Sequence, residues 1–435
     1  MSQERRIITE LPWLVDSIPS DWQVKRLKDI FEESSEVSLS GDEDLLSVSE
    51  YYGVAKRKDK MTEDDEFETR ADTLEGYKVC HKGDLVSNIM LTWKRALGIS
   101  EFEGIVSPAY AVYRGKNIFP KYYHYLLRSD MYIAEFKRNS KGIIESRLRL
   151  YSDRFFSIKT IYPPLVEQEK IARYLDEKIT GIDAYISDRE RELQLLKQLK
   201  QAKINEVVTR SLQDNVPMKD SGISAIGFIP EHWEVRRLKD LFEFGSGLPI
   251  SKADLVEEGV PVISYGQIHA KFNRGTRIDE RLLRYVSPSY IETNPSSLVN
   301  IGDVIFADTS EDLEGCGNCV YVDKKMTLFA GYHTVILRRK RENPFLAYLF
   351  QSQDWRLQIR KQVAGVKLYS ITKSILNNVS VILPPLSEQL EIVNYLDKEC
   401  ELIEKKCALI VEQIEKLQLL KRTLINEVVT GKRRI

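Results

Sequence analysis

Pro163-Pro164-Leu165-Val166-Glu167-Gln168 begins a stretch of the chain that ends at Ile204-Asn205-Glu206-Val207-Val208-Thr209. The same pattern returns as Pro384-Pro385-Leu386-Ser387-Glu388-Gln389 and ends at Ile425-Asn426-Glu427-Val428-Val429-Thr430. Start and end are both displaced by 221 residues (163 to 384, 204 to 425). A common start, a common end and an equal length indicate a duplicated structural segment.

Both segments are predicted to be long helices that form a coiled coil. Proline suits the first helical turn, where its missing N–H would be unpaired anyway. Apolar residues recur every seven positions along two seams, which is the coiled-coil pattern. In the second segment the seams are Leu396, Ile403, Ile410, Leu417, Leu424 and Cys400, Cys407, Ile414, Val428, with Lys421 as an exception. In the first they are Leu175, Ile182, Leu196 and Ile179, Ile186, Leu193, Val207, with Arg189, Lys200 and Lys203 as interruptions and Gly181 as a weak point.

Each helix needs a partner, because a single amphipathic helix of this kind is unstable alone. About 44 residues give a length of about 65 Å at 1.5 Å per residue. The nearest partner is the other helix, and a whole globular unit separates the two, so an antiparallel pair is feasible. The alternative is two independent surface helices.

The repeat extends beyond the helices. Ile18–Glu32 matches Ile229–Glu243, Gly83-Asp84 matches Gly302-Asp303, and Arg149–Ser152 matches Lys367–Ser370, in the same order. Residues 33–75 and 244–295 share almost nothing, and recognition usually resides in variable loops on a common fold. We therefore predict a first body at residues 1–162, a helix at 163–212, a second body at 213–383 and a second helix at 384–435.

The bodies are expected to be α+β, which makes the whole chain α+β with a pseudo-two-fold internal repeat. Helices are predicted at 120–138 and 344–362. Trp22 and Trp233, in matched positions beside proline, are predicted to anchor the core. Strands are predicted at Asp84–Ser87, Tyr110–Tyr113, Ser157–Tyr162, Val304–Phe306, Thr334–Leu337 and Val379–Leu383.

The composition is typical of a globular protein, with 435 residues, 43% hydrophobic and 30% charged, and this length predicts two or more domains. No run of eighteen apolar residues and no secretory signal are found. Five cysteines without disulfide spacing suit a reducing cytosol, so a cytoplasmic protein is expected. The net charge of −1 argues against a general polyanion binder but permits local basic strips.

The order of these features resembles a specificity (S) subunit of a Type I restriction-modification system, over nearly all 435 residues. The matching residues are an Ile-Pro-x-x-Trp segment before each body and a Pro-Pro-Leu-x-Glu-Gln helix start followed by Leu175-Asp176 or Leu396-Asp397. The resemblance implies a non-catalytic subunit in which each body reads one half of an asymmetric bipartite DNA target. It implies double-stranded DNA, two methyltransferase subunits and restriction–translocase subunits as partners, and it places S-adenosylmethionine, ATP and Mg in those partners.

Motifs for chemistry are missing, so we predict no catalytic, cofactor-binding or metal-binding residue. Asn294-Pro295-Ser296-Ser297 lacks the second proline and the aromatic residue of an adenine methyltransferase loop. Phe244-Gly245-Ser246-Gly247 lacks the third glycine of a cofactor loop and is predicted to be a turn. Cys316 and Cys319 form a lone pair, whereas zinc needs four ligands, and a metal site there stays an alternative. His232 occupies the position of Asp21 in the first copy, which predicts a surface role.

DNA contacts are predicted where variable segments are basic or aromatic, because Lys and Arg neutralise phosphates while Gln, Asn and Arg suit base edges. A solvated loop is the alternative for each segment, and a coiled-coil scaffold without DNA specificity is the alternative for the whole chain. The candidates in the first body are Lys56, Arg57, Lys58, Lys60, Lys94, Arg95, Lys141, Arg147, Arg149 and Tyr151. Those in the second body are Tyr265, Gln267, His269, Lys271, Asn273, Arg274, Arg277, Lys367, Tyr369 and Ser370.

Overall fold

The structure is a computed structural model that describes residues 5–57, 73–339, 342–365 and 368–435. Its contacts divide the chain into two units. Unit 1 comprises Met1–Glu190 and Glu412–Ile435, and unit 2 comprises Arg191–Val411. Each unit therefore contains one globular body together with a part of both long helices. No helix in the described part of the chain is both long and apolar enough to cross a bilayer.

Unit 1 is built around a four-stranded antiparallel sheet of order β4-β11-β8-β9. These strands are Phe31–Glu33, Tyr110–Gly115, Leu85–Asn88 and Leu97–Ile99. The hairpin β5–β6 (Leu46–Ser49, Gly53–Lys56) and the pairs β1–β2 (Arg5–Ile7, Ser17–Pro19), β7–β10 (Lys78–Cys80, Gly104–Val106) and β3–β12 (Gln23–Arg26, Lys159–Tyr162) complete the strands. The helices of the body are α1 (Pro120–Leu127), α2 (Asp130–Asn139) and α3 (Ser152–Ser157).

Unit 2 repeats this arrangement. Its four-stranded sheet has the order β16-β25-β21-β23 (Glu243–Ser246, Thr334–Arg338, Val304–Ala307, Cys319–Tyr321), and β15–β27 (Glu234–Arg237, Ser380–Leu383) and β13–β14 (Met218–Asp220, Phe228–Pro230) correspond to β3–β12 and β1–β2. The helices α8 (Pro344–Leu349), α9 (Gln353–Arg360) and α10 (Lys373–Asn378) correspond to α1, α2 and α3. The sequence repeat is therefore a repeat of one fold.

Unit 2 also contains a five-stranded sheet, which lies largely in the stretch that differs between the two halves of the sequence. Its order is β17-β19-β18-β24-β20 (Leu255–Val256, Arg284–Val286, Val260–Ile263, Leu328–Ala330, Leu298–Val299), and β18 pairs with β24 in parallel. Short helices α5 (Leu238–Leu241), α6 (Tyr265–Ile268) and α7 (Tyr290–Thr293) and the pair β22–β26 (Thr309–Ser310, Tyr369–Ser370) complete the unit.

The predicted strands are confirmed within one or two residues at their ends. The predicted helices at 120–138 and 344–362 are each wrong in one respect, because both are divided in two. A serine stands at the N-cap of the second helix in each case, and Ser352 Oγ accepts a hydrogen bond from Trp355 N at 3.1 Å. Such a bond to a backbone N–H favours a new helix start at Ser352, whereas the Ser129 side chain makes no cap hydrogen bond. The turn predicted at Phe244–Gly247 is also wrong, since Phe244, Gly245 and Ser246 lie in β16 and pair with β25.

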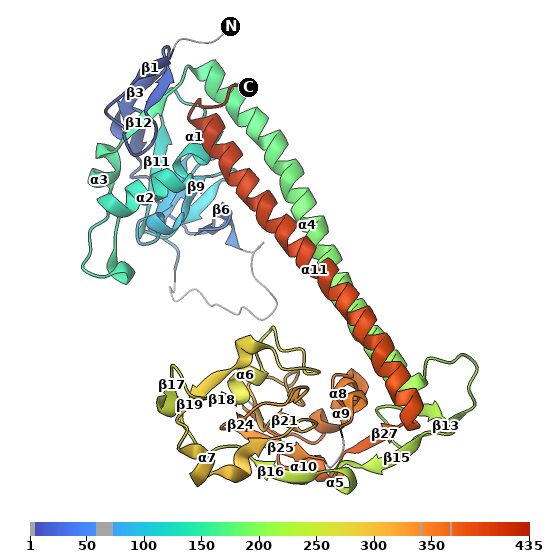
Figure 1. The fold of residues 1–435 in the computed structure, drawn as a ribbon. Coiled ribbons are helices and arrows are strands. Elements are labelled where there is room, and N and C mark those ends of the chain that lie inside the picture. Colours follow the sequence, from blue (N-terminus) through green and yellow to red (C-terminus); the bar gives the residue numbers. More distant parts are fainter. Residues whose placement is uncertain (1–4, 58–72, 340–341, 366–367) are drawn as a thin grey trace. The chain divides into compact units, whose positions relative to one another are not determined.

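The long helices α4 (Leu165–Arg210) and α11 (Leu386–Val429) form the predicted antiparallel pair (Figure 1). In unit 2 the pairs Lys200–Glu404 (2.6 Å) and Lys203–Glu399 (2.9 Å) show that numbers rise along one helix as they fall along the other. In unit 1, Lys421 Nζ lies 2.6 Å from Asp183 Oδ1. The three lysines that interrupt the predicted seams therefore pair with acids of the opposite helix. The helix α4 also continues through Gly181 without a break.

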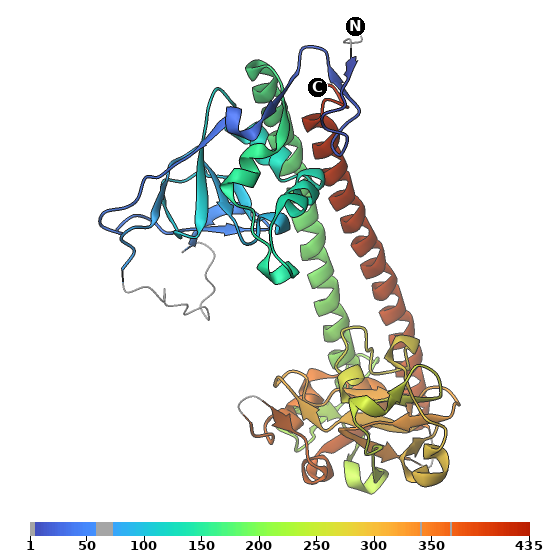
Figure 2. The same cartoon turned by 90° about the vertical axis from the view of Figure 1, so that its left-hand side faces the viewer.

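Each body completes its core with both helices. In unit 1 the buried cluster around Trp22 includes Leu175 from α4 and Val428 from α11. In unit 2 the cluster around Trp233 includes Val207 from α4 and Leu396 from α11. Figure 2 shows the N-terminal segment beside the end of α11, where Arg5 Nη1 donates to Gly431 O at 2.6 Å. Since apolar burial is the main stabilising term, neither body is complete without the helix pair.

Candidate DNA interface

In unit 1, Glu167 and Gln168 at the start of α4 form hydrogen bonds that attach the body to this helix. The Trp22 side chain is 1% exposed, and its Nε1 donates a hydrogen bond to Glu167 Oε2 at 2.8 Å. Gln168 Nε2 donates to Pro163 O at 2.8 Å, while Gln168 Oε1 accepts from Phe119 N at 2.8 Å. Buried polar groups need such partners, which explains why tryptophan, glutamate and glutamine occur together in the repeat.

Unit 2 has the same contacts. Trp233 Nε1 donates to Glu388 Oε2 at 3.1 Å, and Gln389 Nε2 donates to Pro384 O at 2.7 Å. The predicted role of both tryptophans as core anchors is confirmed. His232 is exposed, as its predicted surface role requires, and its Nε2 lies 2.7 Å from the Glu388 carboxylate. Its exposed ring therefore contacts the same glutamate that the buried Trp233 contacts.

The Leu-Asp dipeptide of each helix makes a second matched attachment. Leu175 and Leu396 are fully buried. The Tyr125 hydroxyl donates to Asp176 Oδ1 at 2.5 Å, and the Tyr348 hydroxyl donates to Asp397 Oδ1 at 2.6 Å. Each tyrosine comes from the helix that follows the four-stranded sheet. The neighbouring carboxylate and burial both raise the pKa of each tyrosine, so each hydroxyl keeps its proton and remains a donor.

The Gly-Asp pairs are turns with a structural role. Gly83 and Gly302 have φ of +97° and +89°, which only glycine adopts without strain. Asp84 and Asp303 accept hydrogen bonds from His81 N and Asn300 N, each at 2.9 Å. Burial raises the pKa of both aspartates. Across the described residues, no group of three or more His, Cys, Asp or Glu side chains is arranged to hold a metal ion.

In the first body, several predicted DNA contacts are engaged in pairs within the protein. Lys56 Nζ lies 2.6 Å from Asp44 Oδ2, and the Arg95 guanidinium bonds Asp130. Lys94 is exposed and lies 5.1 Å over the Trp93 ring. Burial raises the pKa of the Tyr110 hydroxyl, and the nearby positive charge of Arg57 opposes this rise with a smaller effect. Lys58 and Lys60 lie outside the described residues.

The segment that joins α2 to α3 brings the remaining candidates of the first body together. Lys141 and Arg147 are exposed, Arg149 is half-buried and Tyr151 is 45% exposed. Lys141 N and Arg149 O, and Arg149 N and Lys141 O, form a reciprocal pair of hydrogen bonds at 2.9 Å. This pair closes a loop whose cationic side chains face solvent.

In the second body, the residues predicted to read bases are held by the protein itself. Asn273 Nδ2 donates to Ile268 O at 2.7 Å and to Cys319 O at 3.1 Å, so both of its donors are used. Gln267 Oε1 accepts from Ser264 N at 3.1 Å. Arg274 and Arg277 pair with acids of α11, Glu404 at 2.7 Å and Asp397 at 3.6 Å. Lys271 is exposed.

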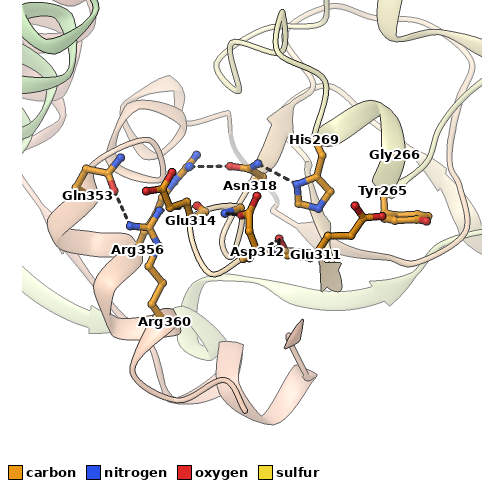
Figure 3. A pocket seen from close by; sticks show the side chains of 12 residues that line it. Tyr265, Gly266, His269, Glu311, Asp312, Glu314, Asn318, Gln353, Arg356 and Arg360 are labelled. Carbon is orange, nitrogen blue, oxygen red and sulfur yellow. Dashed lines mark hydrogen bonds between the residues drawn. The ribbon is translucent and has the colours of Figure 1, made fainter. Parts of the chain in front are cut away.

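His269 lies in a polar pocket of the second body, with a cavity volume of about 760 Å³. Figure 3 shows a chain of hydrogen bonds in which Arg356 Nη1 donates to Asn318 Oδ1 at 2.7 Å, and Asn318 Nδ2 faces His269 Nδ1 at 3.0 Å. His269 Nε2 faces Thr309 O at 2.8 Å. A carbonyl can only accept, so Nε2 donates to Thr309 O and Nδ1 accepts from the Asn318 amide. Tyr265 lines the same pocket.

The last predicted DNA contacts of the second body lie in or next to strand β26, whose partner strand β22 contributes Ser310 to the same pocket. Tyr369 and Ser370 form β26, which pairs with Ser310 and Thr309, and Ser370 is exposed. Lys367 lies outside the described residues. Cys316 and Cys319 are buried, and burial raises the pKa of the Cys319 thiol to about 12. The two thiols are therefore protonated at neutral pH.

Comparison with known proteins finds similar sequences and similar folds. Residues 230–416 match a family model described as the Type I restriction modification DNA specificity domain. The chain is 24% identical to the Type I restriction enzyme MjaVIII specificity subunit of Methanocaldococcus jannaschii, with 96% of this chain and 94% of that protein covered. It is 25% identical to the EcoKI specificity subunit of Escherichia coli over 65% of this chain and 59% of that protein.

Solved structures show the same fold. A chain from a study of complex assembly and conformational transition of the type I R-M system matches with a TM-score of 0.69 and 17% identity, covering 96% of this chain and 99% of that one. The HsdS subunit of Thermoanaerobacter tengcongensis matches with a TM-score of 0.50 and 18% identity, covering 96% and 98%.

The chain therefore shares its fold with these solved structures, and its residues 230–416 match a DNA specificity domain. The whole chain is similar in sequence to Type I restriction enzyme specificity subunits, and residues 230–416 match the DNA specificity domain of such proteins.

Proposed function

We propose that residues 1–162 contact one half of an asymmetric bipartite DNA target and residues 213–383 contact the other half. The observation that carries this proposal is that both bodies join the helix pair through the same Trp–Glu and Tyr–Asp hydrogen bonds, while the stretches 33–75 and 244–295 differ. Equivalent attachment suits the two-fold symmetry of the DNA backbone. Unlike loops then give unlike half-sites.

The interface we propose is smaller than the set predicted from sequence. Gln267, His269, Asn273, Arg274 and Arg277 have structural roles, because their polar groups bond the body or α11. Lys56 and Arg95 are likewise paired with acids. The proposed contacts are Arg57, Lys58, Lys60, Lys94, Lys141, Arg147, Arg149, Tyr151, Tyr265, Lys271, Lys367, Tyr369 and Ser370.

The exposed faces of the long helices are the proposed docking surface for two methyltransferase subunits. Leu195, Leu199, Leu402 and Leu409 in unit 2 are 46–59% exposed, although they lie on helices that are otherwise charged. Tyr185, Leu419 and Leu420 in unit 1 are exposed to a similar degree. Apolar side chains grouped on a surface favour burial against a partner. S-adenosylmethionine, ATP and Mg would then belong to the methyltransferase and restriction–translocase subunits.

The second candidate function is a coiled-coil scaffold without DNA specificity of its own, which the net charge of −1 favours. An in vitro selection of bound DNA distinguishes the two candidate functions. The chain, co-expressed with its modification subunits, is incubated with random duplexes, and the bound fraction is sequenced. The proposal predicts one bipartite motif with a constant gap and affinity that falls with salt. Enrichment of no motif would support the scaffold.

A further inference from the structure

We propose that Ile143 and Ile144 form an apolar wedge that enters the base stack of the DNA from the minor groove, an inference that rests on the proposed function. Both residues lie near the middle of the loop between α2 and α3, a position called the tip here. Figure 1 shows this loop projecting from the first body. Ile143 is 100% exposed and Ile144 is 53% exposed.

The loop has a fixed shape. The paired hydrogen bonds between Lys141 and Arg149 close its base, and Leu150 is buried while its N–H donates to Ile89 O at 2.9 Å. A Cβ at Gly142 would lie 2.6 Å from Arg147 O, so the close approach requires glycine. A turn of 3-10 helix (Glu145–Arg147) follows the isoleucines. The two side chains are therefore held away from the core.

The charge around the tip identifies the occupant as DNA. Residues 137–154 contain six Lys or Arg and two Asp or Glu, a net charge of +4 in a chain whose total is −1. Glu145, one of the two acids, is neutralised by Lys137. Proteins that kink DNA place apolar side chains between base steps and surround them with basic residues on the phosphates. An apolar protein partner would not require this charge.

The second body has a corresponding segment. Residues 360–373 carry four Lys or Arg and no acid, again a net charge of +4. A Cβ at Gly365 would lie 2.2 Å from Leu368 O, and Leu368 is 56% exposed. Leu368 aligns with the buried Leu150, so the second body repeats the glycine and the basic charge of this segment but not the two isoleucines.

The test measures DNA bending and unwinding by the full-length chain with its modification subunits. The probe is the duplex selected by the wild type, in a circular-permutation gel and in plasmid relaxation by a topoisomerase. The wild type is expected to kink the duplex by roughly 20° or more. Ile143→Ser with Ile144→Ser should abolish most of this bend and unwinding, while the salt dependence of affinity stays unchanged because no charge is removed. Ile7→Ser, at a side chain of the same body that is 84% exposed and lies outside the variable stretch 33–75, is the matched control and should bend DNA like the wild type.

The outcomes separate this inference from the proposed function. Bending by the double variant equal to the wild type overturns the wedge and leaves the proposed function intact. Normal bending with loss of the modification subunits would show that the tip docks protein, which also overturns the wedge. A wild type that binds no duplex overturns the proposed function and the wedge together. Thermal unfolding of both variants at the wild-type midpoint confirms that the loop change did not alter the fold.

Discussion

Trp22 Nε1 donates a 2.8 Å hydrogen bond to the carboxylate of Glu167, which lies 145 residues later in the chain. The bond joins the entrance of the first body to the first turn of α4. Trp22→Phe keeps most of the buried ring but leaves the carboxylate without this donor. The free energy of unfolding should fall by about 1–3 kcal/mol, the cost of an unsatisfied buried group.

A double-mutant cycle with Glu167→Gln gives the coupling between the two residues. The equivalent pair in unit 2, Trp233 with Glu388, is the matched comparison, because Glu388 keeps a second partner in His232. Trp233→Phe should therefore cost less than Trp22→Phe. Zero coupling in the first pair would show that the hydrogen bond does not hold the body to the helix.

Asn273 and Lys271 should behave differently although they are two residues apart. Asn273→Ala leaves Ile268 O and Cys319 O without a donor and should lower stability by about 1–3 kcal/mol, while the selected DNA motif stays the same. Lys271→Gln should leave stability unchanged and reduce the salt slope of DNA binding by about 1. A changed motif in the Asn273 variant would restore that residue to the reading surface.

Folding should shift the pKa values of two histidines of the first body in opposite directions. Hydrogen bonds to Glu36 and Glu103 raise the pKa of His81 above 6.5, whereas burial lowers the pKa of His124 to about 3. His81 therefore stabilises the fold below pH 6.5, and this contribution is lost as pH rises through its raised pKa. The unfolded chain protonates His124 near 6.5 but the folded chain does not, so stability falls as pH drops below 6.5, by up to about 1.4 kcal/mol per pH unit.

Histidine-selective ¹³C NMR checks both statements, with signals assigned from His81→Gln and His124→Gln. The His124 signal should not move between pH 8 and pH 5, and the midpoint of the His81 signal should lie above 6.5. Movement of the His124 signal near pH 6.5 would show that its ring, which accepts a hydrogen bond from Ile99 N at 3.2 Å, is not buried in solution.

The helices should set the gap between the two half-sites. Insertion of seven residues after Gln198 in α4 and after Lys406 in α11 preserves the seven-residue repeat and adds about 10 Å to the pair. At about 3.4 Å per base pair, the selected gap should grow by about three base pairs while both half-sites stay the same. An unchanged gap would mean that the helix pair does not determine the spacing.

The sequence predicted the helix pair well, because one motif marks the start and end of each helix and the seams repeat between them. The seam interruptions were harder to interpret. Lys200 and Lys203 look like defects along one helix, and only the antiparallel register brings them to Glu404 and Glu399. An acid on the other helix is the signal that could have identified these pairs.

The site was less predictable than the fold. Asparagine is a residue type that suits base edges, so Asn273 was predicted to read DNA. Pairing between distant strands instead brings its amide to backbone carbonyls, to which it donates. The short strands of the five-stranded sheet could not be foreseen either, since β18 and β24 are joined in parallel at Val262 and Phe329. Such strands are stabilised by long-range partners and not by a local pattern. The exposed Ile143 required the structure, because sequence does not reveal that a β-branched residue faces solvent.

The most direct test of the account is to exchange residues 213–383 for those of a related specificity subunit and to determine the methylated or selected DNA motif. The account predicts that one half-site changes to that of the donor protein, while the other half-site and the gap stay the same. A change in both half-sites, or in neither, would contradict the assignment of one body to each half of the target.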